Sequence, residues 1–249
     1  METPIIEVSH LTKNFRLMNR RYGLKNILLH LPNYVRDLRH PREFTALNDV
    51  SFTVRRGERI GLTGRNGCGK TTLLSVIGGV YRSYQGEVKV RGRVSMMLAL
   101  GAGMHPELSG RENVILNGVL QGKTRREMLA LMDDIRAFAD IGEFFDAPLY
   151  QYSSGMKARL GFAVITAIEP EILLVDEVLA VGDAEFRKKC AERIDQLLAR
   201  GCTLFLVSHN AKDIRRCCDR VIKLDHGRIV ADGPVDEVMP PEILPPEKP

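Results

Sequence analysis

The sequence has no long hydrophobic run and no leader-like N-terminus. None of its apolar stretches approaches the length of about 20 residues that a membrane-spanning helix needs. The first residues, METPIIEVSHLTK, also lack the basic and then apolar arrangement of a secretory signal peptide. We therefore expect a protein that is made and kept in the cytoplasm.

Cysteine is scarce, and its spacing excludes two common kinds of site. The count of five is odd, and no pair has C-x-x-C spacing. This favours free thiols in a reducing compartment over a disulfide or zinc framework. The five are Cys68, Cys190, Cys202, Cys217 and Cys218.

The excess of positive charge is small and is confined to one segment. The net charge of the chain is +5, and residues 16–43 contain seven basic and two acidic side chains. The remainder of the chain is therefore balanced in charge. This pattern argues against a generally basic nucleic-acid-binding protein and for one local basic insertion, so no nucleic-acid partner is expected.

The order of expected elements predicts the fold. Apolar residues make up 44% of the chain and charged residues 27%, which permits a sizeable core. Strands alternate with helices at both ends of the chain, and a helical block interrupts them from about residue 100 to residue 168. We predict an α/β fold with a parallel-sheet core, an antiparallel β subdomain and an inserted helical subdomain. One domain spans residues 1–239, and the Pro-rich tail 240–249 is expected to be disordered.

A glycine-rich stretch, GRNGCGKT, fits the phosphate-loop pattern G-x-x-x-x-G-K-[ST]. It follows an expected strand, Arg59–Leu62, and opens an expected helix, which disfavours the alternative of a chance Gly-rich turn. Lys70 is expected to reach the β- and γ-phosphates of a nucleotide, and Thr71 to bind Mg²⁺. Cys68 lies inside the loop, so alkylation of its thiol is expected to block nucleotide binding. The expected nucleotide-binding residues are Gly64, Arg65, Asn66, Gly67, Cys68, Gly69, Lys70, Thr71 and Thr72.

Polar side chains follow two strongly apolar stretches that read as buried strands. ILLVDE ends in Asp176 and Glu177, and LFLVSH ends in His209. Ligands of open α/β sheets collect at the carboxyl ends of the strands. Asp176 suits a Mg²⁺ site, Glu177 a general base for water, and His209 a contact to the γ-phosphate or the water. The alternatives are that the acidic pair begins a turn and that His209 is structural. The loop motif alone leaves kinases, GTPases and motors open.

The stretch YSSGMKARLGFAV, residues 152–164, narrows this choice. It resembles the signature segment of ABC-transporter ATPases, although it also reads as an ordinary N-capped helix. The resemblance implies that two copies dimerise head to tail. Ser153, Ser154 and Gly155 of one copy would then contact the γ-phosphate held by the other. It also implies that Phe15 stacks on adenine and that Asp183 crosses the dimer interface.

Within that family the chain resembles the ATP-binding subunits of bacterial exporters of O-antigen, capsular polysaccharide and teichoic acid, over about residues 5 to 235. The sequence departs from the family pattern in one loop, where the family places Gln or Glu. The equivalent position in this chain is Ala99 or Leu100, and neither side chain can ligate Mg²⁺.

The resemblance implies an ATP-hydrolysing homodimer at the cytoplasmic face of the bacterial inner membrane. Its partners would be two copies of a multi-span permease and a lipid-linked polysaccharide, O-antigen first. The alternatives are a soluble ABC ATPase acting on ribosomes or DNA and a regulatory protein that only binds ATP.

The basic insertion carries a one-sided helical pattern. Leu24, Ile27, Leu28 and Leu31 follow the spacing of one helix face, surrounded by basic residues. Such a helix suits the anionic inner-leaflet surface, where it could guide a pyrophosphate-bearing lipid-linked polymer. The alternative is that the apolar face packs on the ATPase core and the charges are solvated.

Overall fold

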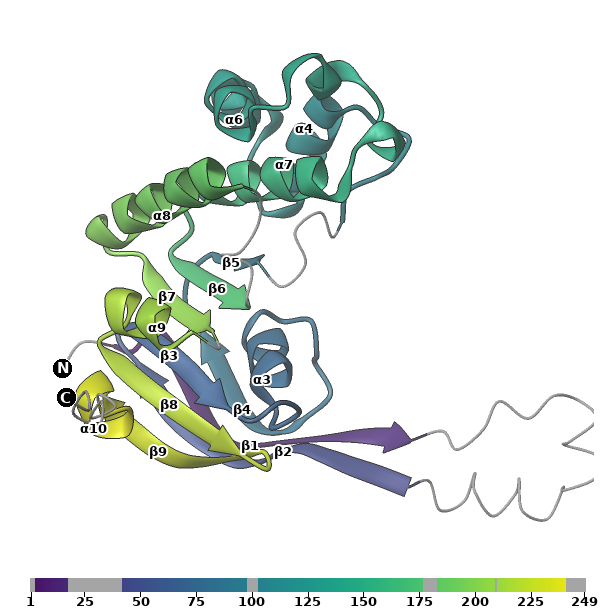
Figure 1. Cartoon of the computed structure of the whole chain (residues 1–249). Coiled ribbons are helices and arrows are strands. Elements are labelled where there is room, and N and C mark those ends of the chain that lie inside the picture. The colour runs from purple at the N-terminus through teal and green to yellow at the C-terminus, as the bar shows by residue number, and fades with distance from the viewer. Residues whose placement is uncertain (1–2, 18–41, 98–102, 177–182, 209, 241–249) are drawn as a thin grey trace, which may run out of the picture.

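The computed structural model describes residues 3–17, 42–97, 103–176, 183–208 and 210–240, and every structural statement below refers to these ranges. Two sheets and α3 form one lobe, and a group of helices forms a second lobe (Figure 1). The expected combination of a parallel sheet, an antiparallel sheet and a helical subdomain is confirmed.

The larger sheet is parallel except at one edge. Its strand order is β5-β6-β7-β3-β8-β9, and only β9 runs antiparallel to its neighbour. The strands are β3 (Arg59–Gly64), β5 (Val94–Met97), β6 (Ile172–Asp176), β7 (Thr203–Val207), β8 (Arg220–Asp225) and β9 (Arg228–Pro234). β7 is buried at every residue, as its continuous apolar sequence predicts for a central parallel strand. β8 and β9 form a hairpin that turns through His226 and Gly227, both at positive φ, as a type I′ turn requires.

The smaller sheet carries the insertion. β1 (Ile6–Leu17) lies between β2 (Arg42–Val54) and β4 (Gln85–Val90), antiparallel to both. β1 and β2 remain paired as far as Leu17 and Arg42 and project as a ribbon from the lobe (Figure 1). Residues 16, 17, 42 and 43, which the sequence analysis assigns to the insertion, are therefore strand residues. The expected amphipathic helix 24–31 lies outside the described residues.

The helical lobe is built from short helices with well-formed ends. Ser109 and Thr124 each cap a helix through reciprocal hydrogen bonds with the Glu three residues later. The helical periodicity of TRREMLALMDDIRAFAD predicts helix over residues 124–140. The structure has two helices there, which are separated at Leu131. The helices of this lobe are α4 (Gly110–Leu120), α5 (Arg125–Ala130), α6 (Met132–Ala139), η1 (Gly142–Asp146), η2 (Leu149–Gln151) and α7 (Ser154–Ala167).

The remaining helices are associated with the sheets. α8 (Ala184–Ala199) ends shortly before Gly201, whose φ of 85° is typical of a glycine that follows a helix. The others are α3 (Lys70–Ile77), α9 (Ala211–Cys217) and α10 (Val235–Val238), of which α10 was not expected from sequence. Among the described helices, none has both the length and the hydropathy needed to cross a membrane.

Candidate nucleotide site

The phosphate loop joins β3 to α3 and depends on three glycines. Gly64, Gly67 and Gly69 all have positive φ, at 141°, 78° and 109°. A Cβ atom on Gly64 would overlap the carbonyl oxygen of Leu224, and one on Gly69 would overlap that of Ala46. The loop therefore keeps a conformation that other residues cannot adopt without strain. α3 begins without a side-chain cap and without an acidic residue in its first turn, so its N-terminus suits a bound anion.

Lys70 lies folded back over the loop. Its Nζ donates to the carbonyl oxygens of Gly64 at 2.8 Å and Arg65 at 3.1 Å, and the residue is only 7% exposed. A buried ammonium group needs such acceptors. The same group lies where the motif places the phosphates, so it can exchange these carbonyls for phosphate oxygens.

Thr71 and Asp176 meet at the carboxyl edge of the larger sheet. The hydroxyl of Thr71 donates to the carboxylate of Asp176 over 2.7 Å, which joins the start of α3 to the end of β6. Both groups are hard oxygen donors of the kind that Mg²⁺ prefers when phosphates supply its other ligands. The described residues contain no cluster of three or more His, Cys, Asp or Glu side chains that could hold a metal alone. This donor set fits a nucleotide-bound Mg²⁺.

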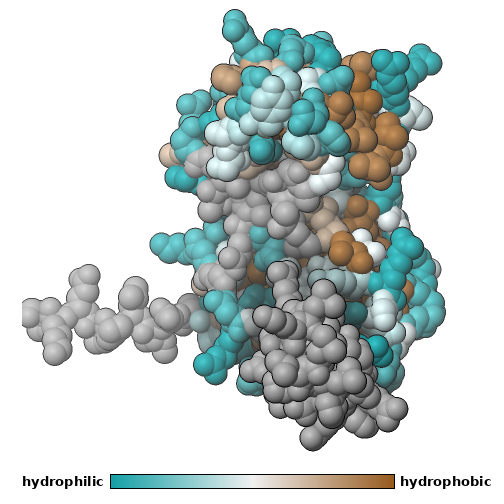
Figure 2. All heavy atoms as spheres, turned by 90° about the vertical axis from the view of Figure 1, so that its right-hand side faces the viewer, coloured by the Kyte–Doolittle hydropathy of each residue, from teal (hydrophilic) through white to brown (hydrophobic). Residues whose placement is uncertain are grey.

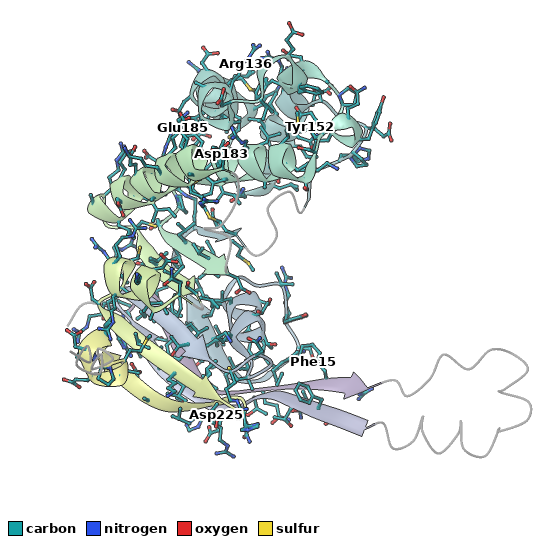
Figure 3. All side chains as sticks on the ribbon, in the orientation of Figure 1. Phe15, Arg136, Tyr152, Asp183, Glu185 and Asp225 are labelled. Atoms are coloured by element: carbon teal, nitrogen blue, oxygen red, sulfur yellow. The ribbon has the colours of Figure 1, made fainter. Side chains whose placement is uncertain are left out.

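Phe15 forms a group with Tyr81 and Lys13. Its ring lies edge-on to that of Tyr81, with centroids 5.3 Å apart, and Lys13 Nζ is 4.9 Å and 5.2 Å from the two ring centroids. Lys13 also donates to the carbonyl of Ser83 at 2.5 Å. Figure 3 shows Phe15 on β1, in the lobe of the sheets. Tyr81 and Lys13 had no motif signal, because they meet Phe15 only through folding.

The signature segment lies in the helical lobe, apart from α3 (Figure 1). Ser153 caps α7, and its Oγ accepts a hydrogen bond from Met156 N. Tyr152 is buried and donates to the carbonyl of Phe144, and burial raises its pKa to about 12. Ser153 and Ser154 themselves are exposed. Tyr152 therefore holds the segment in the core of the lobe, while the two serines of the segment face solvent.

Asp183 caps α8, so it has a structural role besides the one expected from the family resemblance. One carboxylate oxygen accepts from Phe186 N at 2.8 Å, and the other pairs with Arg159 of α7 at 2.6 Å. The hydrogen bond from Phe186 and the charge of Arg159 lower the pKa of the carboxyl group. Sequence reasoning missed Arg159, although it lies within the quoted signature stretch.

Four of the expected functional positions lie outside the described residues. They are Ala99, Leu100, Glu177 and His209. Their neighbours Met97, Asp176 and Ser208 lie at the carboxyl ends of β5, β6 and β7. The roles assigned to these four positions therefore remain predictions.

Comparisons with known proteins identify the family. Residues 47–180 match the family model described as ABC transporter. The chain is 45% identical over 237 residues to the O-antigen export system ATP-binding protein RfbB of Klebsiella pneumoniae, covering 95% of this chain and 96% of that protein. It is 41% identical over 234 residues to the teichoic acids export ATP-binding protein TagH of Levilactobacillus brevis, covering 94% of this chain and 63% of that protein.

The fold is also that of a known ATPase structure. The ATP-binding cassette MJ0796, in a dimeric post-hydrolysis state bound to ADP and Pi, matches with a TM-score of 0.70 at 21% identity, covering 92% of this chain and 98% of that one. The chain belongs to the ABC transporter family, and it is one of the ATPase subunits of that family.

Proposed function

We propose that this chain powers the export of a lipid-linked polysaccharide across the bacterial inner membrane. O-antigen is the first candidate polymer, and capsular polysaccharide or teichoic acid comes next. One observation carries the proposal: the identity to an O-antigen export ATP-binding protein extends over 95% of the chain. The similarity to a teichoic acids export protein supports the same class of polymer.

The phosphate loop supplies the binding half of the hydrolysis site. Backbone N–H groups of residues 64–72 would surround the phosphates, and Lys70 would turn from the loop carbonyls to the β- and γ-phosphates. Thr71 and Asp176 would hold Mg²⁺, which neutralises charge on the phosphates when bound. Glu177 would accept a proton from the attacking water, and His209 would contact the γ-phosphate.

The signature residues would complete the site from a second copy. Ser153 and Ser154 are exposed at the start of a 14-residue helix that has no acidic residue in its first turn. Ser153 Oγ accepts from Met156 N and still has its own O–H to donate to a phosphate. Because these residues and the phosphate loop lie in different lobes, a head-to-tail homodimer is the arrangement in which both serve one nucleotide.

Replacement of Glu177 tests the site. Glu177→Gln keeps the size of the side chain but cannot accept the proton, so ATP turnover should fall to background while ATP binding persists. The variant should then accumulate as an ATP-bound dimer, measured by size-exclusion chromatography with and without ATP. Hydrolysis near the wild-type rate would refute the role of Glu177, and a strictly monomeric ATP-loaded variant would refute the shared site.

Transport requires a membrane partner at the cytoplasmic face. Figure 2 shows hydrophobic residues gathered over the helical lobe and again below it. Val80, Val119 and Leu120 are among the exposed large apolar side chains, at 62%, 48% and 68%. Exposed apolar patches are typical of protein interfaces, and two copies of a multi-span permease are the expected occupants. Since Ala99 and Leu100 cannot ligate Mg²⁺, their loop would act by contacting this partner.

Purification and deletion test the transport function. The chain should co-purify from detergent with a multi-span membrane protein, and deletion of its gene should remove one surface polysaccharide. Co-purification with ribosomes or DNA instead would favour the soluble alternative.

The basic insertion is assigned to the polymer and the anionic leaflet. Residues 18–41 join the paired ends of the β1–β2 ribbon, which projects from the lobe of the sheets. Replacement of Arg20, Arg21 and Lys25 by Ser should reduce export while ATPase activity stays normal, because each basic residue near an anionic leaflet contributes about 1 kcal/mol. Unchanged export would favour packing of the helix on the core.

A further inference from the structure

Three phenylalanine rings join α6, α7 and α8 into one packed unit. Phe138 of α6 stacks on Phe162 of α7, with centroids 5.6 Å apart and planes 13° apart. Phe186 of α8 lies edge-on to both, at 5.7 Å and 6.3 Å. All three distances lie within the favourable range for aromatic pairs. Movement of one of these helices relative to the others would break ring contacts.

Two arginines cover this unit from different helices. The guanidinium of Arg159 lies 4.5 Å from the Phe186 centroid, and that of Arg193 lies 4.7 Å from the Phe138 centroid. Each arginine also pairs with acidic residues of other elements, and their side chains are similarly covered, at 19% and 21% exposed. The two residues therefore make matched kinds of contact.

Their acidic partners differ in position. Arg193, in the middle of α8, binds both carboxylate oxygens of Asp134 in α6 at 3.0 Å. Arg159 binds Asp183, the cap of α8, at 2.6 Å and lies 3.7 Å from the carboxylate of Asp140 at the end of α6. Among the described contacts, only Arg159 thus connects the N-terminus of α8 to α7 by an ion pair.

This connection joins the signature helix, which is proposed to contact the second copy's ATP, to Asp183, which the family resemblance implies crosses the dimer interface. Arg159 follows the signature residue Ser153 by six positions on α7, a rise of about 9 Å along the helix. Asp183 follows the undescribed segment 177–182, which begins with the proposed base Glu177. Figure 3 shows Asp183 at the N-terminal end of α8, next to the helical lobe.

We propose that Arg159 is a positioning residue for ATP hydrolysis, which fixes Asp183 relative to the signature helix so that both segments reach the ATP of a second copy as one body. The proposal rests on the shared site proposed above. Its physical basis is that both carboxylate oxygens of Asp183 are held, one by Phe186 N and one by Arg159. Loss of the arginine leaves the cap and the contacts among the three rings in place but releases the second carboxylate oxygen of Asp183 from α7.

The test compares Arg159→Gln with Arg193→Gln. Both variants remove one charge and one ring contact at similar burial; Arg159→Gln removes the ion pairs to Asp183 and Asp140, and Arg193→Gln removes the bidentate pair to Asp134. Both should therefore lower the thermal midpoint. Arg159→Gln should also lower kcat by about 10- to 100-fold, because displacement of reacting groups by about 1 Å has effects of that size. The Kd for ATP should stay near the wild-type value, since ATP binds first to each copy's own phosphate loop. Arg193→Gln should keep kcat near wild type.

Arg159→Lys provides a second version that keeps the charge. Its ammonium group reaches fewer partners than the guanidinium, so kcat should lie between that of the wild type and that of Arg159→Gln. A wild-type kcat in folded Arg159→Gln, or in Arg159→Lys if the Gln variant does not fold, would overturn the proposal, as would equal losses of kcat in the Arg159 and Arg193 variants. Dimerisation of the Glu177→Gln variant with ATP distinguishes failure of the shared ATP site from failure of the positioning role of Arg159. If that dimer does not form, the shared site itself fails; if it forms and Arg159→Gln hydrolyses ATP normally, only the positioning role fails.

Discussion

The hydroxyl of Thr71 and the carboxylate of Asp176 lie in direct hydrogen-bond contact at 2.7 Å, although 105 residues separate them in the sequence. Thr71 is in the first turn of α3, and Asp176 is the last residue of β6. Because β3 and β6 run parallel in one sheet, their carboxyl ends face the same edge. The contact brings together the two residues that we propose hold a nucleotide-bound Mg²⁺.

Removal of the Thr71 hydroxyl should lower the apparent affinity of the protein for Mg²⁺ during ATP hydrolysis. In Thr71→Ala, Asp176 loses its hydrogen-bond partner and the proposed Mg²⁺ site loses a ligand. The Mg²⁺ concentration for half-maximal ATPase activity should rise by about 10-fold or more. Thr71→Ser keeps the hydroxyl and should stay near wild type in the same titration. Equal Mg²⁺ dependence in both variants would contradict the assignment.

The phosphate-loop glycines should differ in their tolerance of alanine. At Gly64 a Cβ atom would overlap the Leu224 carbonyl, whereas at Gly67 it would meet no atom within 4 Å. Gly67→Ala should lower the free energy of unfolding by about 1–2 kcal/mol, the backbone penalty for positive φ. Gly64→Ala should lower it by more, because a steric clash is added. Urea unfolding measures both, and a smaller loss for Gly64→Ala would contradict the loop geometry.

Phe15 should contribute to ATP affinity by stacking. Phe15→Ala should raise the Kd for ATP by about 5- to 150-fold, since a base stacked on an aromatic ring gains about 1–3 kcal/mol. Phe15→Tyr keeps the ring and is the control. Equilibrium binding of ATP measures both. An unchanged Kd for ATP in Phe15→Ala would contradict stacking on adenine and would leave the Phe15 ring with its packing contact to Tyr81.

The native cysteines should resist thiol reagents. All five are free and buried, including Cys68, whose sulfur packs beside Gly64. Burial raises the pKa of Cys190 to about 12 and that of Cys202 to about 11, so neither forms the reactive thiolate near neutral pH. A chromogenic disulfide reagent should therefore titrate the thiols only after unfolding in urea. Rapid reaction of folded protein at Cys68, with loss of ATP binding, would support the sequence-based expectation instead.

The two capping boxes should make the stability of the helical lobe sensitive to acid. Hydrogen bonds from the side chain and backbone of Ser109 lower the pKa of Glu112, and those from Thr124 lower the pKa of Glu127. The ordinary pKa of a Glu carboxyl group is 4.5. When folding lowers that pKa, the ionised group stabilises the folded protein at pH values above 4.5. That contribution is lost as the pH falls through the lower, folded pKa.

The double variant Glu112→Gln, Glu127→Gln should therefore flatten the fall in stability between pH 5 and pH 3. Urea unfolding at several pH values measures the fall. Glu143→Gln, which removes an exposed carboxylate of η1, is the control. An unchanged acid limb in the double variant would contradict the assigned hydrogen bonds.

Local patterns predicted most of the elements. Continuous apolar runs predicted β6 and β7. Gly57, Gly122 and Gly201 stand where glycine favours a turn or a helix end, and all three have positive φ. The phosphate loop was predictable because its residues form one contiguous motif, GRNGCGKT, in the sequence. The helical periodicity over residues 124–140 is confirmed, but the division into α5 and α6 at Leu131 was not predicted, because no Gly or Pro signals it.

Long-range contacts were not predictable in the same way. The pairing of β1 with β2 beyond Phe15 and the ring contact with Tyr81 depend on residues distant in sequence. Asp183 looked like an interface residue, and nothing local showed that it also pairs with Arg159. Such contacts depend on the packing of whole helices.

The sequence by itself determined which chemical groups are available to this protein: a glycine-rich loop of the phosphate-binding pattern, oxygen donors of the kind that Mg²⁺ prefers, and serines at the start of a helix. These depend on neighbouring residues and on backbone conformations that only certain residues adopt. Only the tertiary structure decided that Thr71 meets Asp176, that Lys70 rests on loop carbonyls and that Arg159 ties α8 to α7. The physical reason is that a hydrogen bond or ion pair acts over a few ångströms, so its partners are set by how sheets and helices pack.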